Sequence, residues 1–322
     1  MQMGAPAANG RVIGLLIGME DAFPGPFLEM VNERGRGAGV RAELARIAGE
    51  RDLGEPRYSV VIDRISHEVP FYRTYLKSAA LQGTVVINDP FWWEADEKFF
   101  ESTLAQMLGV AHPKTVMVPN YQFIPEIDRE QSLRNYGPLD WEGMTTYTGL
   151  PAVLKPNTGG GWKDVHIVQT IDEAVAAWET TGLKSMILQE FIDWNDYVRC
   201  ICIGRQHVLP LRYNPRLEGY NRYEVDKPVT GELRERIISD SRKLCEALGY
   251  DMDTIEWAIR DGVPYAIDFL NPAPDFNVRS IKDEAFNWVL EHMTELALAY
   301  AIGEQLPPWK GEHRWWRFVN NA

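Results

Sequence analysis

The stretch VLKPNTGGGWKDVHIV, residues 153–168, places three consecutive glycines between two apolar runs. Lys155 ends the first run, and Lys163 follows the glycines. Glycines let a backbone approach a ligand closely and aim successive N–H groups at phosphate oxygens. The stretch therefore predicts two strands joined by an anion-binding loop. A hairpin turn with solvated lysines is the alternative that this stretch alone leaves open.

Signatures of the common nucleotide-binding and hydrolase folds are missing from the sequence. No glycine is followed directly by lysine, which excludes a Walker loop. The run GRGAGV has Val40 where a dinucleotide-binding fingerprint needs its last glycine. No serine has a glycine two residues before it, which excludes a nucleophile elbow. The six histidines are scattered along the chain, and we expect structural or surface roles for them.

Length and composition set broad limits. A chain of 322 residues predicts two or three domains. The formal net charge of −13 argues against a nucleic-acid partner, whose binding surface would be basic. Cys200 and Cys202 share one face of a predicted strand and Cys245 is remote in sequence, so we expect reduced, buried thiols. The first apolar run, residues 12–19, is too short to cross a bilayer, and we expect a soluble cytoplasmic protein without a membrane partner.

Apolar runs that resemble buried strands alternate with helical patterns over the first 90 residues. The predicted strands are residues 11–19, 58–66 and 84–89. The predicted helices are residues 24–35, 40–56 and 70–83. This alternation predicts a mainly parallel α/β sheet.

The rest of the chain mixes antiparallel strands with helices. The predicted helices are residues 95–110, 170–181, 232–249 and about 280–302. The predicted strands after the glycine loop are residues 185–192, 197–204, 206–214, 254–260 and 263–271. The connection at residues 121–151 is rich in glycine, proline and aromatic residues and is predicted to be irregular.

A second cluster, DTIEWAIRDGVPYAIDFLNP, places Glu256 and Asp268 on one predicted hairpin. A two-residue turn at Asp261-Gly262 would pair Glu256 with Ile267 and send Asp268 to the other face. A three-residue turn pairs Glu256 with Ala266 and makes Asp268 its diagonal neighbour on the same face, about 7–8 Å away. We predict the three-residue turn. Mg²⁺ is commonly held by one or two such carboxylates together with phosphate oxygens.

The order and spacing of these motifs resemble the ATP-grasp superfamily, in the branch that contains glutathione synthetase and the enzymes that ligate glutamate to peptides or proteins. The segments that carry the resemblance are residues 61–89, 95–115, 152–156 and 187–192 and the Glu256–Asn271 hairpin. The resemblance implies nucleotide contacts by Lys98, Lys155, Gly159, Gly160, Gly161, Lys163, Gln189, Glu190, Phe191, Ile192 and Asp196. It implies magnesium ligation by Glu256, Asp268 and Asn271.

Some positions depart from the family pattern. Trp162 and Asp164 stand where glycines are expected, and Asp275 stands where the family commonly has glycine. That aspartate either meets a substrate amine or caps the next segment. The resemblance implies basic groups near the γ-phosphate and a substrate carboxylate in the segment that holds Arg212, Arg216 and Arg222, and arginine can donate to both as a bidentate group. We expect Arg212 and Arg222 to take these roles, because Arg212 ends a predicted strand and Arg222 lies near the position that the family pattern implies.

The resemblance implies an α/β (α+β) ATP-grasp fold, with a parallel α/β domain at residues 1–111 and two α+β subdomains, 112–192 and 193–322, that clasp ATP. It implies an ATP-dependent carboxylate–amine ligase that uses ATP and Mg²⁺ (or Mn²⁺), forms an acyl phosphate and releases ADP and phosphate. The expected substrates are a small carboxylate and an amine such as an amino acid or peptide. A phosphotransferase and an ATP-binding protein without catalysis stay open as alternatives, as does formation of a homo-oligomer.

Overall fold

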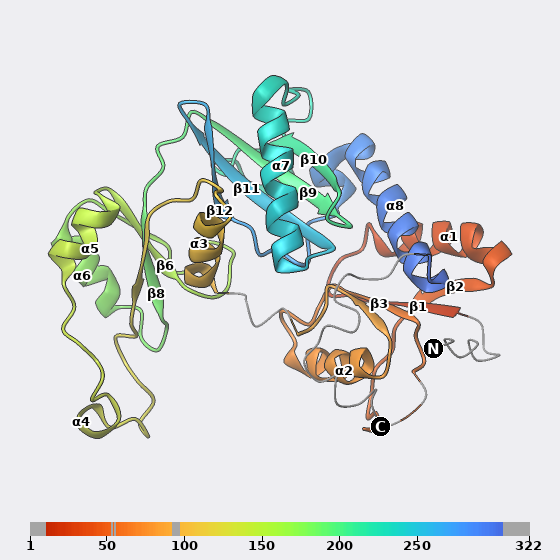
Figure 1. Cartoon of the computed structure of the whole chain (residues 1–322), viewed down its shortest axis with the longest axis horizontal. Coiled ribbons are helices and arrows are strands. Elements are labelled where there is room, and N and C mark those ends of the chain that lie inside the picture. Colours follow the sequence, from red (N-terminus) through yellow and green to blue (C-terminus); the bar gives the residue numbers. More distant parts are fainter. Residues whose placement is uncertain (1–10, 53, 55, 92–96, 305–322) are drawn as a thin grey trace. The chain divides into compact units, whose positions relative to one another are not determined.

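A computed structural model describes residues 11–52, 54, 56–91 and 97–304. The chain forms two compact units (Figure 1). Unit 1 comprises Met1–Trp93, Val198–Ile255 and Leu270–Ala322, and unit 2 comprises Glu94–Tyr197 and Glu256–Phe269. The three-domain division drawn from the sequence stays a prediction. Among the described residues, no helix is both long and apolar enough to cross a membrane.

Unit 1 is built on a four-stranded parallel sheet in the order β2-β1-β3-β4. Its strands are β1 (Arg11–Leu16), β2 (Val40–Leu44), β3 (Val60–Asp63) and β4 (Val85–Ile87). Strands β1, β3 and β4 are buried along nearly their whole length, as parallel strands covered on both faces are. The parallel α/β sheet predicted from the alternating pattern is confirmed.

Strand β2 corrects the helix predicted for residues 40–56. Val40 and Ala42 are buried while Arg41 between them is exposed, which is the two-residue period of a strand. Gly39, at φ +67°, ends the preceding 3₁₀ turn and turns the chain so that Val40 pairs with Arg11 on β1. The charged residues in this short segment favoured the helical interpretation, whereas an edge strand tolerates them well.

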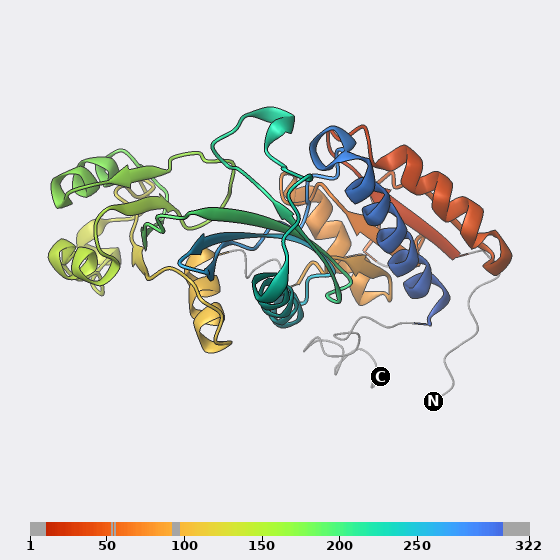
Figure 2. The same cartoon turned by 90° about the horizontal axis from the view of Figure 1, so that it is seen from above.

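Three helices cover the parallel sheet: α1 (Pro24–Arg34), α2 (Pro70–Leu81) and α8 (Val278–Ile302). Helices α1 and α8 lie side by side on one face, while α2 covers the other through Leu76 and Ala80 (Figure 2). Proline stands at the start of α1 and of α2, and Gly35 follows α1, as the sequence predicted. The helix α8 is interrupted at Lys282, which has φ +67°.

Unit 2 contains an antiparallel sheet in the order β5-β8-β6-β7. Its strands are β5 (Thr115–Val118), β6 (Ala152–Pro156), β7 (His166–Val168) and β8 (Met186–Glu190). Helices α5 (Trp141–Thr148) and α6 (Ile171–Glu179) pack on one face of it through Trp141, Met144 and Trp178. The segment 121–151 was predicted to be irregular, but it holds α5 and the one-turn helix α4 (Arg129–Ser132). Both begin at an aspartate N-cap, a signal that the analysis overlooked.

A third sheet has the order β10-β9-β11-β12, and the boundary between the two units passes through β9 and β11. Its strands are β9 (Asp196–Ile203), β10 (His207–Arg212), β11 (Met252–Arg260) and β12 (Val263–Asp268). In unit 1, α7 (Gly231–Leu248) packs on β10 and ends at Gly249 in the left-handed conformation, as predicted. Both predicted hairpins are present as antiparallel pairs.

The β11–β12 turn differs from the prediction. Arg260 pairs with Val263, so the turn has two residues, Asp261 and Gly262, both with positive φ. Such a turn matches the twist of a hairpin, and an aspartate–glycine pair suits it. The predicted three-residue turn is therefore wrong.

Candidate active site

Glu256 and Asp268 form a cross-strand pair in spite of the two-residue turn. Trp257 pairs with Ala266, the register then shifts, and Glu256 pairs directly with Asp268. Ile267 is thus the extra residue of a β-bulge. The bulge brings both carboxylates to one face, which is the outcome that the sequence analysis expected from a different turn. Opposite residues of an antiparallel pair have Cβ atoms about 4.5–5.5 Å apart, so one cation can be shared.

Lys155 on β6 belongs to the same cluster of charges in unit 2. Its side chain is largely buried, and its Nζ donates to the carbonyl of Ile267 at 3.5 Å. Burial lowers the pKa of the Lys155 ammonium, the Asp268 carboxylate opposes that shift, and the Lys98 charge adds to it. The Glu256 carboxylate also raises the pKa of Lys155. Two lysines and the carboxylate pair therefore act on one another electrostatically.

Lys98 is the first residue of α3 (Lys98–Met107) and lies under the glycine loop. Its Nζ donates to the carbonyl of Gly159 at 2.6 Å, and its backbone N–H donates to Asn157 at 2.9 Å. One turn further along α3, Glu101 is 1% exposed and adds a carboxylate beside Lys155. Glu101 was not among the site residues predicted from the sequence. Its spacing of three residues from Lys98 on one helix was the available signal.

The glycine loop has a backbone that glycines adopt more easily than other residues. Gly159 and Gly161 have φ of +87° and +75°. Trp162 and Asp164, which stand where the family pattern expects glycines, also have positive φ, +61° and +56°. A non-glycine residue in this region is strained, and such strain collects at ligand-binding sites. Asp164 forms an ion pair with Lys184.

Lys163 and Gly160 complete the predicted loop, and both are exposed. The structure brings Lys98, Lys155 and the loop together, and it leaves the role of Lys163 a prediction. Each of these contacts lies within unit 2.

The chemistry of this cluster fits a hard divalent cation. Carboxylate oxygens are the donors that Mg²⁺ prefers, and Mg²⁺ completes its shell with water and phosphate oxygens. Within residues 11–52, 54, 56–91 and 97–304, no group of three or more His, Cys, Asp or Glu side chains is arranged to hold a metal ion. Two carboxylates suit a cation that also binds water and phosphate oxygens.

The predicted adenine segment begins at the end of β8, an inner strand of the antiparallel sheet in the same unit. Gln189 on β8 is 3% exposed and donates through Nε2 to Thr115 at 3.0 Å. Glu190 accepts from Arg260 Nη2 at 2.9 Å, which ties β8 to β11. The remaining predicted contacts come directly after β8 or at the start of β9: Phe191, Ile192 and Asp196. Their roles stay predictions.

Three predicted site residues belong to unit 1. Arg212 and Arg222 each lie next to the isolated bridge between Tyr213 and Tyr223. Arg222 donates to the Leu217 carbonyl at 2.8 Å and to the Tyr213 hydroxyl at 3.3 Å.

The third, Asn271, donates its backbone N–H to the buried Asp253 carboxylate at 2.9 Å, so its main chain is fixed. Magnesium ligation by the Asn271 side chain stays a prediction, as do the roles of Arg212 and Arg222.

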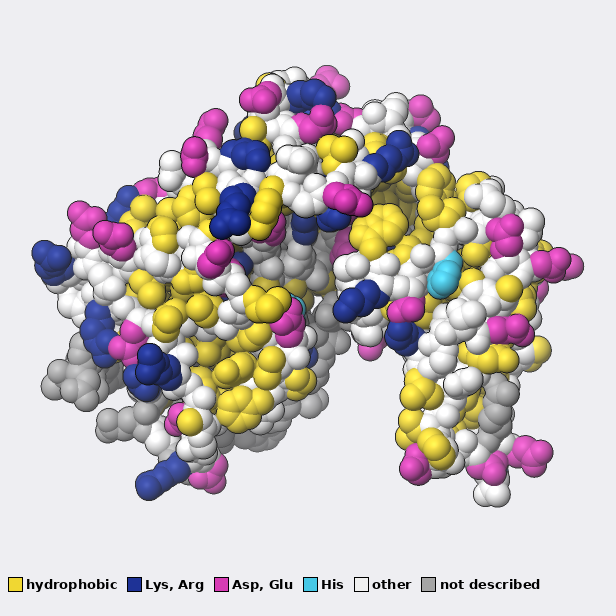
Figure 3. Space-filling view, turned by 180° about the vertical axis from the view of Figure 1, so that it is seen from behind, with side chains coloured by type: hydrophobic (Ala, Val, Ile, Leu, Met, Phe, Trp, Pro, Cys, Tyr) yellow, Lys and Arg dark blue, Asp and Glu magenta, His cyan; other side chains and the backbone are white. Residues whose placement is uncertain are grey.

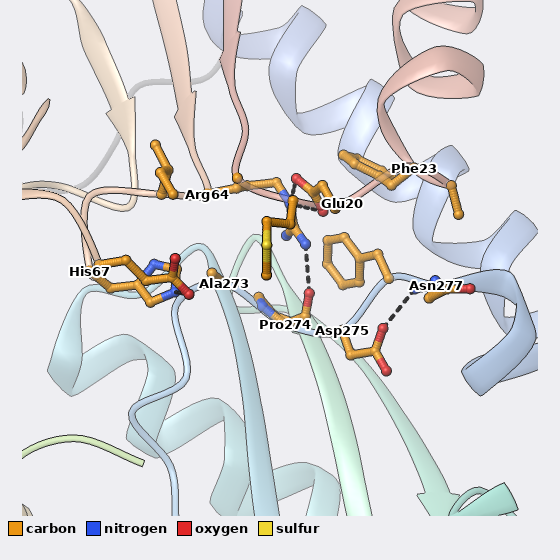
Figure 4. A pocket seen from close by; sticks show the side chains of 14 residues that line it. Glu20, Phe23, Arg64, His67, Ala273, Pro274, Asp275 and Asn277 are labelled. Atoms are coloured by element: carbon orange, nitrogen blue, oxygen red, sulfur yellow. Dashed lines mark hydrogen bonds and ion pairs between the residues drawn. The ribbon is translucent and has the colours of Figure 1, made fainter. Parts of the chain in front are cut away.

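A cavity of 260 Å³ lies within unit 1, between the segments that follow β1 and β3 and residues 273–277 (Figure 4). Arg64 lines it, with a side chain that is 4% exposed. The Arg64 Nε donates to both carboxylate oxygens of Glu20, at 2.6 and 2.8 Å, and Nη2 donates to the Pro274 carbonyl at 2.6 Å. The guanidinium also packs against the rings of Phe23 and Phe276.

The cavity carries an excess of negative charge. Three carboxylates, from Glu20, Glu68 and Asp275, line it against one guanidinium, which leaves a net charge of −2 when His67 is neutral. Burial lowers the pKa of His67, which favours the neutral ring. The carboxylate of Asp275 accepts the backbone N–H of Asn277 at 2.9 Å, so it caps the next segment and also faces the cavity.

This cavity was not predicted from the sequence. Its signal was the position of Glu20 and Arg64 in the segments that follow two parallel strands, because the carboxyl ends of such strands commonly bind ligands. Acidic and basic side chains are otherwise interspersed, as on the face drawn in Figure 3.

The sequence comparison with curated proteins matches D-alanine–D-alanine ligases. No family model matches the chain. A D-alanine–D-alanine ligase of Bacillus anthracis is 24% identical over 159 residues, which is 46% of this chain and 52% of the ligase. The chain thus spans about half the length of the curated relatives that it matches in sequence.

Solved structures cover much more of the chain. The crystal structure of the B. anthracis D-alanine–D-alanine ligase has a TM-score of 0.63 at 17% identity, covering 91% of this chain and 99% of the ligase. A RimK domain ATP-grasp protein of Sphaerobacter thermophilus has a TM-score of 0.61 at 17% identity, covering 91% and 98%. The ATP-grasp ligase PsnB, solved with a minimal precursor, Mg and ADP, has a TM-score of 0.58 at 15% identity, covering 90% and 97%. The fold expected from the motifs is therefore confirmed, and this chain has the ATP-grasp fold.

Proposed function

We propose that the protein is an ATP-dependent carboxylate–amine ligase, which joins a small carboxylate to an amine and releases ADP and phosphate. The single observation that carries the proposal is the cluster of Lys98, Lys155, Glu256 and Asp268 in unit 2, beside the glycine loop. The fold neighbours, among them ligases solved with ATP or with Mg and ADP, add support.

Each part of the cluster has a task in the proposed reaction. The ammonium groups of Lys98 and Lys155 attract the phosphates of ATP, and the amides of residues 159–161 donate to the same oxygens. Glu256 and Asp268 would hold Mg²⁺, which when bound supplies positive charge to the terminal phosphates. Closure of the glycine loop over the phosphates excludes water from the reacting groups.

The proposed reaction has two steps. A carboxylate oxygen of one substrate attacks the γ-phosphorus of ATP, and the bond to the β-phosphate oxygen breaks, which gives an acyl phosphate and ADP. The amine of the second substrate then attacks the acyl carbon, phosphate leaves, and the amine loses a proton to solvent. Arg212 and Arg222 would orient the carboxylate as bidentate donors. No side chain of the protein acts as a nucleophile in this scheme.

The cavity around Arg64 is proposed to bind a small molecule that carries an ammonium group. A net charge of −2 attracts an ammonium group, and 260 Å³ suits a molecule of about the size of an amino acid. Because the Arg64 guanidinium pairs with the Glu20 carboxylate, Glu68 and Asp275 are the carboxylates that we assign to the ammonium group. The substitution D275N should raise the dissociation constant of a bound amino acid, measured by calorimetry, about tenfold.

The test incubates the protein with ATP, Mg²⁺ and pooled small carboxylates and amines, and follows ADP, free phosphate and product masses. Ligation predicts free phosphate in equal amount to ADP together with a new amide mass. K155M and D268N should lower turnover at least about 100-fold. The control K227A removes an exposed lysine that pairs with Glu224, three residues before it, and turnover should stay unchanged. A phosphorylated product without free phosphate would identify a phosphotransferase instead.

A further inference from the structure

The hydroxyl of Tyr197 contacts one of the paired carboxylates. It donates to Glu256 Oε2 at 2.6 Å, and both residues belong to unit 2. Tyr197 is 6% exposed, and its ring packs edge-on against Trp194 at a centroid distance of 5.2 Å. The tyrosine is thus held from two sides, by its ring and by its hydroxyl.

This contact restricts what Glu256 can do. A glutamate carboxylate rotates freely about its last torsion unless a hydrogen bond fixes it. An O–H donor at 2.5–2.7 Å from a carboxylate oxygen forms a strong, charge-assisted bond. Tyr197 therefore fixes the plane of the Glu256 carboxylate at the position where Glu256 pairs with Asp268.

We propose that Tyr197 is a positioning residue for a divalent cation that Glu256 and Asp268 share. The tyrosine does not ligate the ion, and it acts by presenting the Glu256 carboxylate in one orientation. This inference rests on the proposed function, since it assigns the cation to this pair. Groups that orient metal ligands typically change metal affinity 10- to 100-fold when they are removed.

The experiment measures Mn²⁺ binding by electron paramagnetic resonance, with and without ADP, for the full chain and for Y197F. The variant loses one oxygen atom and keeps the ring that packs on Trp194, so it should fold, which its thermal melting will verify. We expect a dissociation constant for Mn²⁺ that is about 10- to 100-fold higher. In the E256Q background, Y197F should cause no further loss, because the carboxylate that it orients is gone.

Y265F is the matched control. Tyr265 lies on β12 of the same hairpin, and its hydroxyl accepts from Arg260 rather than contacting the carboxylate pair. Mn²⁺ affinity of this variant should stay within about twofold of the unmodified chain, which is far less than the effect of removing an orienting group. If turnover is found, Y197F should raise the Mg²⁺ concentration needed for half-maximal rate, and saturating Mg²⁺ should restore kcat.

The outcomes separate the two proposals. Unchanged Mn²⁺ affinity in Y197F, or an equal loss in Y265F, overturns the role of Tyr197 while ligase activity can still be found. Weakened Mn²⁺ binding in Y197F alone supports that role even if no amide product forms, in which case the ligase proposal fails by itself. If the unmodified chain binds no Mn²⁺ with ADP present, the assignment of the cation to Glu256 and Asp268 falls, and the Tyr197 inference falls with it.

Discussion

Arg64 and Glu20 form an ion pair that lines the unit 1 cavity. This pair predicts that substitutions of the two residues have strongly non-additive effects on the free energy of unfolding. Arg64 donates three hydrogen bonds of 2.6–2.8 Å, two to Glu20 and one to the Pro274 carbonyl. R64M keeps the approximate length of the side chain and its contact with Phe23 and Phe276. It leaves the Glu20 carboxylate and the Pro274 oxygen without this donor.

The cost can be worked out from burial. Removing one partner of a buried ion pair costs about 3–5 kcal/mol, because the remaining charge is left uncompensated. Glu20 has a side chain that is 21% exposed, so water screens part of that penalty, and we expect about 3 kcal/mol for R64M. E20Q keeps one acceptor oxygen but leaves the buried Arg64 charge without its partner, and we also expect about 3 kcal/mol. The double variant leaves no unpaired charge and should cost about 4 kcal/mol, which is a coupling of roughly 2 kcal/mol.

Urea denaturation followed by circular dichroism measures the four free energies of unfolding. The control pair is R34M and E291Q, which breaks an exposed ion pair in the same unit, where the coupling should be below about 1 kcal/mol. If the costs of R64M and E20Q add to within about 0.5 kcal/mol, the two charges do not depend on each other and our account of this cavity is wrong.

Two further predictions concern stability. His112 is largely buried, and burial lowers its pKa from 6.5 to about 4. As the pH is lowered, the unfolded chain takes up this proton near pH 6.5 and the folded chain only near pH 4. The free energy of unfolding should therefore fall as the pH decreases from 6.5 to 4, by up to roughly 3 kcal/mol. Urea unfolding at pH 7 and 4.5 measures the loss, and H112Q should remove most of it; an unchanged pH dependence in H112Q would contradict the assignment. G14A places a methyl group 2.8 Å from the Tyr58 ring and should cost about 1–3 kcal/mol, whereas G25A, with open space around it, should cost nothing. Equal melting temperatures for these two variants would contradict the packing seen at Gly14.

The elements that the sequence predicted well are those whose local pattern and tertiary position agree. Strands β1, β3 and β4 are continuous apolar runs, and the helices α1, α2 and α7 carry proline or glycine at their ends. Strand β2 was missed because an edge strand needs only one apolar side, and its charged residues also suit a helix. What decides between the two is pairing with β1, which no local pattern contains.

The residues of the candidate site also divide into those that a local motif predicted and those that only the folded structure brings together. Lys98, Lys155, Glu256 and Asp268 could be selected because each belongs to a motif of known order. Glu101 and Tyr197 belong to no motif, and they matter only through contacts made by residues distant in sequence. The hairpin was predicted with a turn one residue too long and without the bulge at Ile267. Each error alone would have put Asp268 on the other face, and together they left Glu256 and Asp268 on the same face.

Because of that bulge, the number of residues between Glu256 and Asp268 decides whether the two carboxylates lie on the same face of the hairpin. Because side chains alternate along a strand, adding or deleting one residue anywhere between Glu256 and Asp268 reverses the side to which the second acid points. The length of the turn at Asp261-Gly262 and the extra residue Ile267 therefore determine together which face Asp268 occupies. A one-residue change in the turn keeps the acid pair only if the bulge changes by one residue as well. A loop grafted onto this ribbon would preserve the acid pair only if it were longer or shorter by two residues, or if Ile267 were removed at the same time.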